Sequence, residues 1–312
     1  MQNIQHIFEK KQIRIIVTDS GLGGLSVQAL IDKKIRFNGD KEIDLIYFNS
    51  FAGGNFGYNS LKNKDNKLKV FNSALTGMIK FNPDIILIAC NTLSVLYHET
   101  EISKIIKIPV IGIVDSGIEM VLNKIDTESE FNIIILGTDT TIKSNQYKLK
   151  LVENGISEKT IINQICENLE SEIQINPSSE KVENLIRKYL NESYQKILNP
   201  QNRQFILLAC THYGYSTKIF EKVLADLFGN NFTILNPNEK MAEIFDGMKK
   251  TNGIKQNIVK NRILSRVKIR QEQTININEL LKSDSIYIVE AIKNAEYIPD
   301  LFSFDENSIN QK

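Results

Sequence analysis

Apolar residues along this chain fall into short β-branched runs separated by longer stretches with a helical period. The short runs predict strands at residues 13–17, 42–48, 85–90, 108–114, 133–136, 205–210 and 232–235. The amphipathic stretches predict helices at 25–34, 61–81, 94–106, 143–153, 180–198 and 217–228, the fifth capped by Ser178 or Ser179. Strands that alternate with helices indicate an α/β fold with parallel sheets.

One of the predicted strands occurs in two similar copies in the sequence. The segment IILIACNT at 85–92 returns as FILLACTH at 205–212, so Cys90 and Cys210 share an offset of 210 − 90 = 120 residues. The same offset places Thr18-Asp19-Ser20 on Thr138-Asp139-Thr140. An internal duplication of α/β units predicts two pseudo-symmetric parallel-sheet lobes with the active site in the cleft between them.

Composition narrows the class of protein. Hydrophobic residues make up 42% of the 312 residues and charged residues 24%, which is typical of a soluble globular protein. Lys and Arg total 38 against 37 for Asp and Glu, which disfavours a nucleic-acid partner or an acidic membrane surface. No apolar run approaches membrane-spanning length, and residues 1–12 lack a signal-peptide core. Three cysteines, an odd number, fit a reducing compartment, and we expect a cytoplasmic protein.

Both repeated cysteines stand where a parallel strand ends and a helix is about to begin. Ligands bind at this edge of open α/β sheets, and the helix dipole there favours a thiolate of lowered pKa. A cysteine in this position can also be a small buried apolar residue. Recurrence of Ala-Cys before a polar pair in both halves favours a functional role, whereas Cys166 lacks this context and is predicted to be structural.

Three chemistries fit Cys90 and Cys210 in one cleft. With His212 they supply three of the four ligands of a tetrahedral metal site. Cys210 and His212 could form a nucleophile–base pair, although side chains two residues apart on a strand end are expected to diverge. Two thiols on opposite faces of one carbon could also remove a proton on one side and deliver it on the other, which inverts a stereocentre without a cofactor.

A glycine-rich turn, Gly21-Leu-Gly-Gly24, joins the first strand to the first helix. Its backbone N–H groups could bind an anion at the helix N-terminus. The glycines could equally serve only to make the turn tight.

Taken together, these motifs resemble the cofactor-independent aspartate/glutamate racemase family. The resemblance rests on the opening DSGLGGLSV at 19–27, on Cys90-Asn91-Thr92, on CTHY at 210–213, and on Gly137-Thr138 with Thr141, Ser144 and Tyr147. It covers about residues 13–240. It implies reversible exchange of L- and D-glutamate, which supplies D-glutamate for peptidoglycan, with no cofactor and no metal, in a cytoplasmic enzyme that forms a homodimer.

The resemblance also implies the roles of individual residues. Cys90 and Cys210 would be the acid/base pair, with Asp19 assisting Cys90 and His212 assisting Cys210. The substrate would be held by Ser20, Phe56, Gly57, Asn91, Thr92, Thr138, Thr141 and Thr211. Since the family's chain returns to the first lobe, we expect residues 1–114 and 233–312 in the first lobe and its C-terminal tail, and residues 115–232 in the second.

Several positions depart from the family pattern. Ser50 stands at the family's Asp, and Asn55-Phe56-Gly57 stand at its Pro-Tyr-Gly. The glutamate that partners the family's histidine falls on Gln174, with Glu172 close by, and we expect Glu172 to take its place. The tail beyond about residue 252 does not resemble the family, and periodicity suggests only a strand or hairpin at 266–277 and a mixed pattern at 284–292. The alternatives for function are a relative acting on another carboxylic acid (an aspartate racemase, isomerase or decarboxylase) and a catalytically silent binding protein.

Overall fold

Two parallel sheets form the frame of the molecule. The computed structural model describes residues 4–37, 39–53, 57–58, 61, 63–125, 130–248, 256–305 and 309. Within these residues, one sheet has six strands in the order β10-β9-β2-β1-β3-β4 and the other has four in the order β6-β5-β7-β8. All strand pairs are parallel. The strands are β1 (Gln12–Asp19), β2 (Glu42–Asn49), β3 (Ile85–Ile88), β4 (Val110–Gly112), β5 (Phe131–Gly137), β6 (Ile161–Ile165), β7 (Arg203–Ala209), β8 (Phe232–Leu235), β9 (Ile258–Ser265) and β10 (Glu296–Tyr297).

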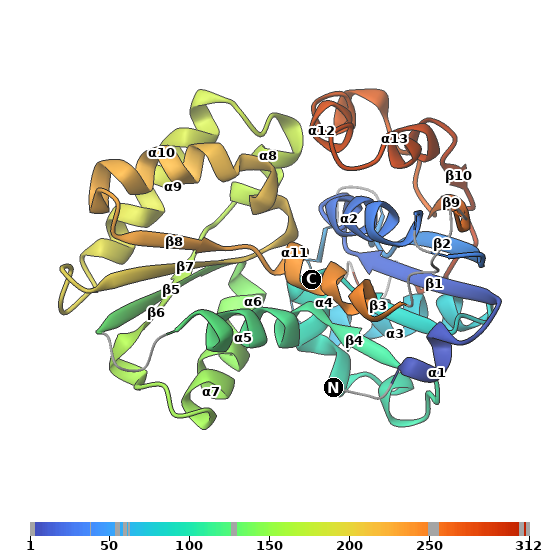
Figure 1. Ribbon diagram of the computed structural model, residues 1–312, viewed down its shortest axis with the longest axis horizontal. Coiled ribbons are helices and arrows are strands. Elements are labelled where there is room, and N and C mark those ends of the chain that lie inside the picture. Colours follow the sequence, from blue (N-terminus) through green and yellow to red (C-terminus); the bar gives the residue numbers. More distant parts are fainter. Residues whose placement is uncertain are drawn as a thin grey trace.

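Helices cover both faces of each sheet, and the two lobes lie side by side (Figure 1). In the second lobe α9 and α10 lie on one face of the sheet and α5 to α7 on the other. The helices are α1 (Gln5–Phe8), α2 (Leu25–Ile35), α3 (Lys64–Ile79), α4 (Asn91–Leu96), α5 (Ile113–Lys124), α6 (Asp139–Lys143), α7 (Gln146–Glu153), α8 (Leu169–Ile175), α9 (Glu180–Tyr194), α10 (Thr217–Phe228), α11 (Pro237–Ala242), α12 (Ile275–Leu281) and α13 (Ile286–Lys293). The predicted α/β fold with two parallel-sheet lobes is confirmed.

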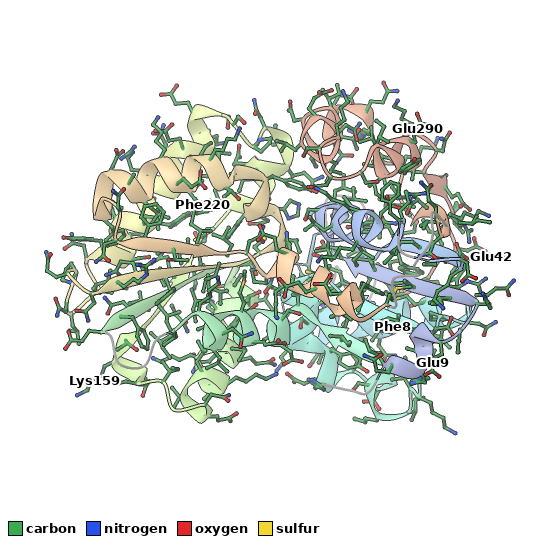
Figure 2. All side chains as sticks on the ribbon, viewed as in Figure 1. Phe8, Glu9, Glu42, Lys159, Phe220 and Glu290 are labelled. Carbon is green, nitrogen blue, oxygen red and sulfur yellow. The ribbon has the colours of Figure 1, made fainter. Side chains whose placement is uncertain are left out.

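The strands are apolar on both faces because both faces are covered. Along β1, Ile15 and Val17 pack into one buried cluster and Ile16 into the other, as the two-residue alternation of a strand requires. Charged side chains such as Glu42 and Glu290 lie on the outside, whereas Phe220 of α10 is fully buried (Figure 2). Of the helices that the structure describes, none is long and apolar enough to cross a membrane.

Local polar signals set several helix starts. The Asn63 side chain accepts a hydrogen bond from the Asn66 N–H and caps α3. Ser179 caps α9 by accepting from the Val182 N–H, which confirms one of the two predicted caps. Asn236 caps α11, which has Pro237 in its first turn.

The elements between Cys90 and residue 114 differ from the prediction. The helix expected at 94–106 begins earlier, as α4, and gives way to short 3-10 turns at Tyr97–Glu99 and Ile102–Lys104. The strand expected at 108–114 is only β4, because α5 already begins at Ile113. Strand β6 was missed by the periodicity; it is short and runs directly into the polar segment before α8.

The tail returns to the first lobe. Strand β9 pairs with β2 along its whole length. The strand or hairpin expected at 266–277 is wrong, because this stretch holds a 3-10 turn, Gln271–Gln273, and the start of α12. Residues 284–292 fall mainly in α13. The predicted boundary between residues 232 and 233 falls inside β8, which belongs to the second sheet, so that sheet extends slightly past this boundary. The division into domains itself stays a prediction.

Candidate active site

Cys90 and Cys210 occupy matching places in the two sheets. Cys90 follows β3 and is the N-cap residue of α4, and Cys210 follows β7 and precedes the 3-10 helix Thr211–Ser216. Both side chains are buried, with exposed fractions of 5% and 6%. Cys90 belongs to one of the two apolar clusters and Cys210 to the other. The thiols therefore come from opposite faces of the layered core.

The resting thiols are protonated. Burial raises the pKa of Cys90 to about 12, with a further rise from the negative charge of Asp19. Burial also raises the pKa of Cys210 well above its usual range, and the charges of Cys90 and Asp19 are among the smaller contributions. The thiolate expected from the helix dipole is therefore wrong for the free protein, because desolvation outweighs the dipole at these buried positions.

On the Cys90 side, the neighbouring groups come from the end of β1. Ser20 Oγ lies 3.1 Å from Cys90 Sγ. Asp19 is buried, and its Oδ1 accepts a hydrogen bond of 2.8 Å from the Gly21 N–H. Its Oδ2 accepts one of 2.9 Å from Thr211 Oγ1, which belongs to the second lobe. Burial raises the pKa of Asp19 to about 6, so it is mostly ionised at pH 7.

On the Cys210 side, His212 bridges the thiol and an amide. Cys210 Sγ lies 3.9 Å from His212 Nδ1, and His212 Nε2 lies 2.7 Å from Gln174 Oε1. Because an amide oxygen can only accept, Nε2 carries the proton and Nδ1 is left to accept from the thiol. Burial lowers the pKa of His212 to about 4, so the ring is neutral at pH 7. The expected divergence of Cys210 and His212 is wrong, because the backbone leaves its extended course and turns into the 3-10 helix between them.

The partner of His212 is also different from the one expected. Glu172 pairs with Lys181 at 2.7 Å, and Gln174 makes the contact with the imidazole. Both residues belong to α8, where side chains two positions apart point in different directions. His212 is therefore oriented by a neutral group in this chain.

Threonine hydroxyls from both lobes meet next to Cys90. Thr92 Oγ1 lies 2.9 Å from Thr138 Oγ1 and 3.4 Å from Thr141 Oγ1, and the last two lie 3.1 Å apart. All three side chains are buried. Asn91, at the start of α4, accepts a hydrogen bond of 2.6 Å from Tyr147 of the second lobe. The structure thus brings together the predicted residues Cys90, Cys210, Asp19, His212, Ser20, Asn91, Thr92, Thr138, Thr141 and Thr211 at the facing ends of the two sheets.

The loop after β2 is only partly described. Phe56 and Asn55 lie outside the described residues, and Gly57 is partly exposed near the ring of Phe51. Ser50, at the family's Asp, is buried and lies 2.7 Å from the hydroxyl of Thr18 on β1.

The glycine-rich turn has a function that neither sequence interpretation foresaw. A Cβ on Gly23 would lie 2.4 Å from Thr211 Oγ1 and 2.7 Å from His212 Nδ1. A Cβ on Gly24 would lie 2.7 Å from the Cβ of Asp19. The glycines therefore allow the first lobe to lie directly against the Thr211-His212 segment of the second. Tyr215, which sequence reasoning missed, donates a hydrogen bond of 3.1 Å to the Leu22 carbonyl and fixes the same turn.

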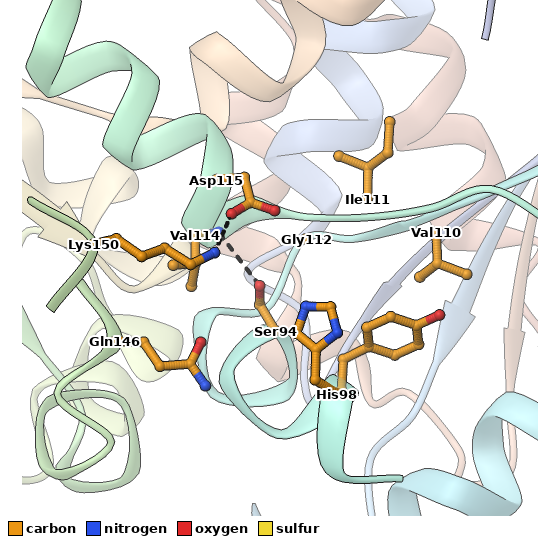
Figure 3. Close-up of a pocket in the computed structure, with 10 residues that line it drawn as sticks. Ser94, His98, Val110, Ile111, Gly112, Val114, Asp115, Gln146 and Lys150 are labelled. Carbon is orange, nitrogen blue, oxygen red and sulfur yellow. Dashed lines mark hydrogen bonds and ion pairs between the residues drawn. The ribbon is translucent and has the colours of Figure 1, made fainter. Parts of the chain in front are cut away.

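A separate cavity of about 440 Å³ opens beside α4, β4 and α7 (Figure 3). Its lining includes Ser94, His98 and Gln146, and an ion pair joins Lys150 to Asp115 at its edge. These lining residues are distinct from the predicted site residues. Among the residues that the structure describes, no three His, Cys, Asp or Glu side chains gather as a metal site.

Comparison with known proteins gives a consistent assignment. The family model for Asp/Glu/hydantoin racemase matches residues 25–271, which extends past the end of the motif resemblance and into the tail. The chain is 30% identical over 217 residues to a glutamate racemase of Fusobacterium nucleatum, covering 69% of this chain and 74% of that protein. It is 29% identical over 216 residues to one of Aquifex pyrophilus, covering 69% of this chain and 77% of that one.

Solved structures agree on the fold. The glutamate racemase of Campylobacter jejuni aligns with a TM-score of 0.65 at 21% identity, covering 86% of this chain and 98% of that chain. The glutamate racemase of Francisella tularensis, solved in complex with D-glutamate, aligns with a TM-score of 0.67 at 19% identity. The alignment covers 93% of this chain and 98% of that chain. The chain belongs to the Asp/Glu/hydantoin racemase family, and it is an isomerase of the racemase type.

Proposed function

We propose that this protein interconverts L- and D-glutamate by proton transfer between Cys90 and Cys210, and that it supplies D-glutamate for peptidoglycan. The observation that carries the proposal is the placement of two buried thiols at matching strand ends, in opposite clusters of the core. Curated relatives that are 29% and 30% identical are named glutamate racemases, which supports glutamate as the substrate.

Each thiol has its own proton acceptor. Asp19, mostly ionised at pH 7, lies on the Cys90 side, and the neutral His212 presents Nδ1 to Cys210. In one direction Asp19 accepts the Cys90 proton, the Cys90 thiolate takes the Cα proton, and the Cys210 thiol gives its proton to the opposite face of the carbanion. Exchange with solvent then returns a proton to Cys210 and removes the one on Asp19 before the next turnover. In the other direction the two thiols exchange roles, so atoms and charges balance over each turnover.

The polar groups around the thiols would hold the substrate. Thr92, Thr138 and Thr141 cluster beside Cys90, and Thr211 lies between Asp19 and Cys210. Ser20, Asn91 and Gly57 complete the set proposed from the described residues, and Phe56 stays a prediction. Oriented donors around the two carboxylates would stabilise the negative charge that develops at Cα.

The test is exchange of the Cα hydrogen in D2O. Purified protein with D-glutamate, and no added pyridoxal phosphate or metal, should incorporate deuterium at Cα and form L-glutamate, followed by NMR and polarimetry. Absence of exchange with glutamate, but exchange with aspartate or another acid, would redirect the proposal to a relative of different specificity. Absence with all of them would favour a silent binding protein.

Single thiol variants test the two-face mechanism. Cys90→Ala and Cys210→Ala should both lose racemisation, yet each should keep exchange with one enantiomer, and the two variants should keep opposite ones. This pattern follows because one remaining thiol can remove and return a proton on one face only. Cys166→Ala, which removes a buried thiol near Gln164, is the matched control and should keep racemisation. The mechanism would be contradicted if one variant lost exchange with both enantiomers while the other variant kept exchange with both.

A further inference from the structure

Tyr147 reaches from the second lobe to the strand end that carries Cys90. It lies in the first turn of α7, is buried, and donates a hydrogen bond of 2.6 Å to Asn91 Oδ1. Its neighbour Gln146 donates one of 2.7 Å to the Val95 carbonyl, so the start of α7 is attached to α4 at two points. Gly117 on α5 leaves room for the phenol, because a Cβ there would lie 2.8 Å from the Tyr147 ring.

The contact leaves one half of the Asn91 amide unused. Asn91 Oδ1 accepts from Tyr147, whereas Nδ2 is buried and has no hydrogen-bond partner among the described residues. A buried donor without a partner is costly, and such groups in an active site are commonly satisfied by the ligand. Asn91 follows Cys90 directly, which places this donor at the reacting end of the first lobe.

The direction of the Tyr147 hydrogen bond decides which amide atom remains available. If the amide were rotated by half a turn, Nδ2 would donate to the phenol and Oδ1 would present a lone pair to an anionic substrate. Burial raises the pKa of Tyr147, so the phenol keeps the proton that it donates. Resting on the proposed function, we infer that Tyr147 is a positioning residue, which holds Asn91 with Nδ2 directed at a carboxylate of the substrate.

The inference is tested by a double-mutant cycle on glutamate racemisation. Tyr147→Phe removes the donor and keeps the ring, so the Asn91 amide is free to rotate. KM should rise about tenfold or more with little change in kcat, the size expected for one hydrogen bond to a bound anion. In a protein that already carries Asn91→Ala, adding Tyr147→Phe should change KM by less than about twofold, because the amide that Tyr147 orients is absent.

Controls separate positioning from general damage to the fold. Tyr189→Phe removes another largely buried phenol, which donates to the Glu167 carbonyl at 2.8 Å in a different part of the second lobe. Tyr189→Phe should lower thermal stability about as much as Tyr147→Phe does, but it should leave KM unchanged. If Asn91→Ala is too slow for kinetics, protection against thermal unfolding by D-glutamate replaces KM in the cycle.

Two outcomes overturn the inference. One is a Tyr147→Phe variant whose KM stays within twofold of the unmodified protein. The other is an increase in KM that persists in full without the Asn91 side chain. An unmodified protein that fails to exchange the Cα hydrogen of glutamate would instead refute the proposed function, which is a different result.

Discussion

The two proposed acid/base partners differ at the scale of single residues. Asp19 is an anion held by Gly21 and Thr211, whereas His212 is neutral and held by the amide of Gln174. Burial shifts both pKa values towards the uncharged form, that of Asp19 up to about 6 and that of His212 down to about 4. The kcat values of the two directions should therefore respond differently to pH and to substitution, whereas kcat/KM stays equal, because the enantiomers have the same free energy.

Replacing Gln174 with Glu should alter kcat mainly in the direction that begins at Cys210. A carboxylate at this position would stabilise the imidazolium and raise the pKa of His212 towards neutrality, which makes it a better proton acceptor. Turnover in the direction that begins at Cys210 should rise roughly fivefold at pH 8, from about 1 kcal/mol of added charge-assisted bonding. The acid limb of its pH profile should move to higher pH.

Glu172→Gln is the control for this change, because Glu172 pairs with Lys181 and does not contact the imidazole. It should leave the pH profile unchanged in both directions. Identical profiles for Gln174→Glu and the unmodified protein, measured from each enantiomer, would show that His212 needs no charged partner.

Asp19 should impose an acid limit on racemisation. Its pKa of about 6 means that the carboxylate loses its charge as the pH falls through this value. The kcat/KM should then fall roughly tenfold for each pH unit below 6, equally from both enantiomers, because the two have the same free energy. Asp19→Asn should be slow and lack this limb. Asp139→Asn, at the duplicated position but in an exposed pair with Lys143, should keep it. A limb that survives in Asp19→Asn would have to belong to another group.

At the scale of elements, the duplicated halves share neighbours but differ in register. In each sheet the strand that precedes the cysteine lies beside the first long strand of its lobe, β3 by β1 and β7 by β5. In the first lobe Thr18 pairs with Ile88. The offset of 120 residues would therefore pair Thr138 with Leu208, but the residue that pairs with Leu208 is Leu136. The second lobe is thus shifted by two residues, which keeps side chains on the same face. Asp19 is the last residue of β1, whereas Asp139 is the first residue of α6 and pairs with Lys143 along that helix.

The turn before α2 should tolerate substitution unequally. Gly23→Ala would place a methyl group 2.4 Å from Thr211 Oγ1, so Thr211 or the turn must move. We expect a loss of about 1–3 kcal/mol of stability and a large loss of activity, because the contact with Asp19 is displaced. Gly21→Ala meets nothing closer than 3.5 Å and should be nearly neutral for stability. Equal urea midpoints for the two variants would refute the close approach.

At the scale of the whole molecule, each lobe contacts the proposed reacting segment of the other. Tyr147, Thr138 and Thr141 of the second lobe contact Asn91 and Thr92. In return the turn before α2 and Asp19 contact the segment after Cys210. Lys67 of α3 adds a hydrogen bond of 2.6 Å to Thr140. Separation of the lobes would disorganise both sides of the site together.

One buried carboxylate adds to the pairing of β9 with β2 in attaching the tail to the first lobe. Asp32 on α2 pairs with Arg36 and accepts hydrogen bonds from Asn261 of β9 at 2.8 Å and Ser285 at 2.6 Å. The Arg36 guanidinium stacks on the Tyr287 ring at 3.6 Å. Asp32→Ala should therefore cost about 3–5 kcal/mol of stability, because it leaves a buried cation and two donors without their acceptor.

A more exposed pair between the same helix and the tail gives the comparison for Asp32. Asp284→Ala breaks the contact of Lys33 with Asp284, whose side chains are 55% and 32% exposed, and should cost less than about 1 kcal/mol. Both variants can be measured by urea denaturation. Similar losses for the two would mean that the tail is not held through Asp32.

The sequence by itself determined the architecture, because it depends on patterns that repeat along the chain. Alternating apolar runs and amphipathic stretches predicted the parallel sheets, and the 120-residue repeat predicted the two lobes. Cys90, Cys210 and the residues beside them were found because motif residues lie next to one another in the chain. The tail escaped prediction, since β9 is a strand through pairing with β2 rather than through its own alternation.

Contacts between distant segments were decided only by the tertiary structure. Gln174 meets His212, Tyr147 meets Asn91 and Gly23 meets Thr211 across 38, 56 and 188 residues, and no local pattern encodes which side chain faces which. The protonation state of the two thiols was also decided only by the tertiary structure. A helix N-terminus favours a thiolate in any sequence, but only packing excludes water from Cys90 and Cys210, and that desolvation reverses the expected direction of their pKa.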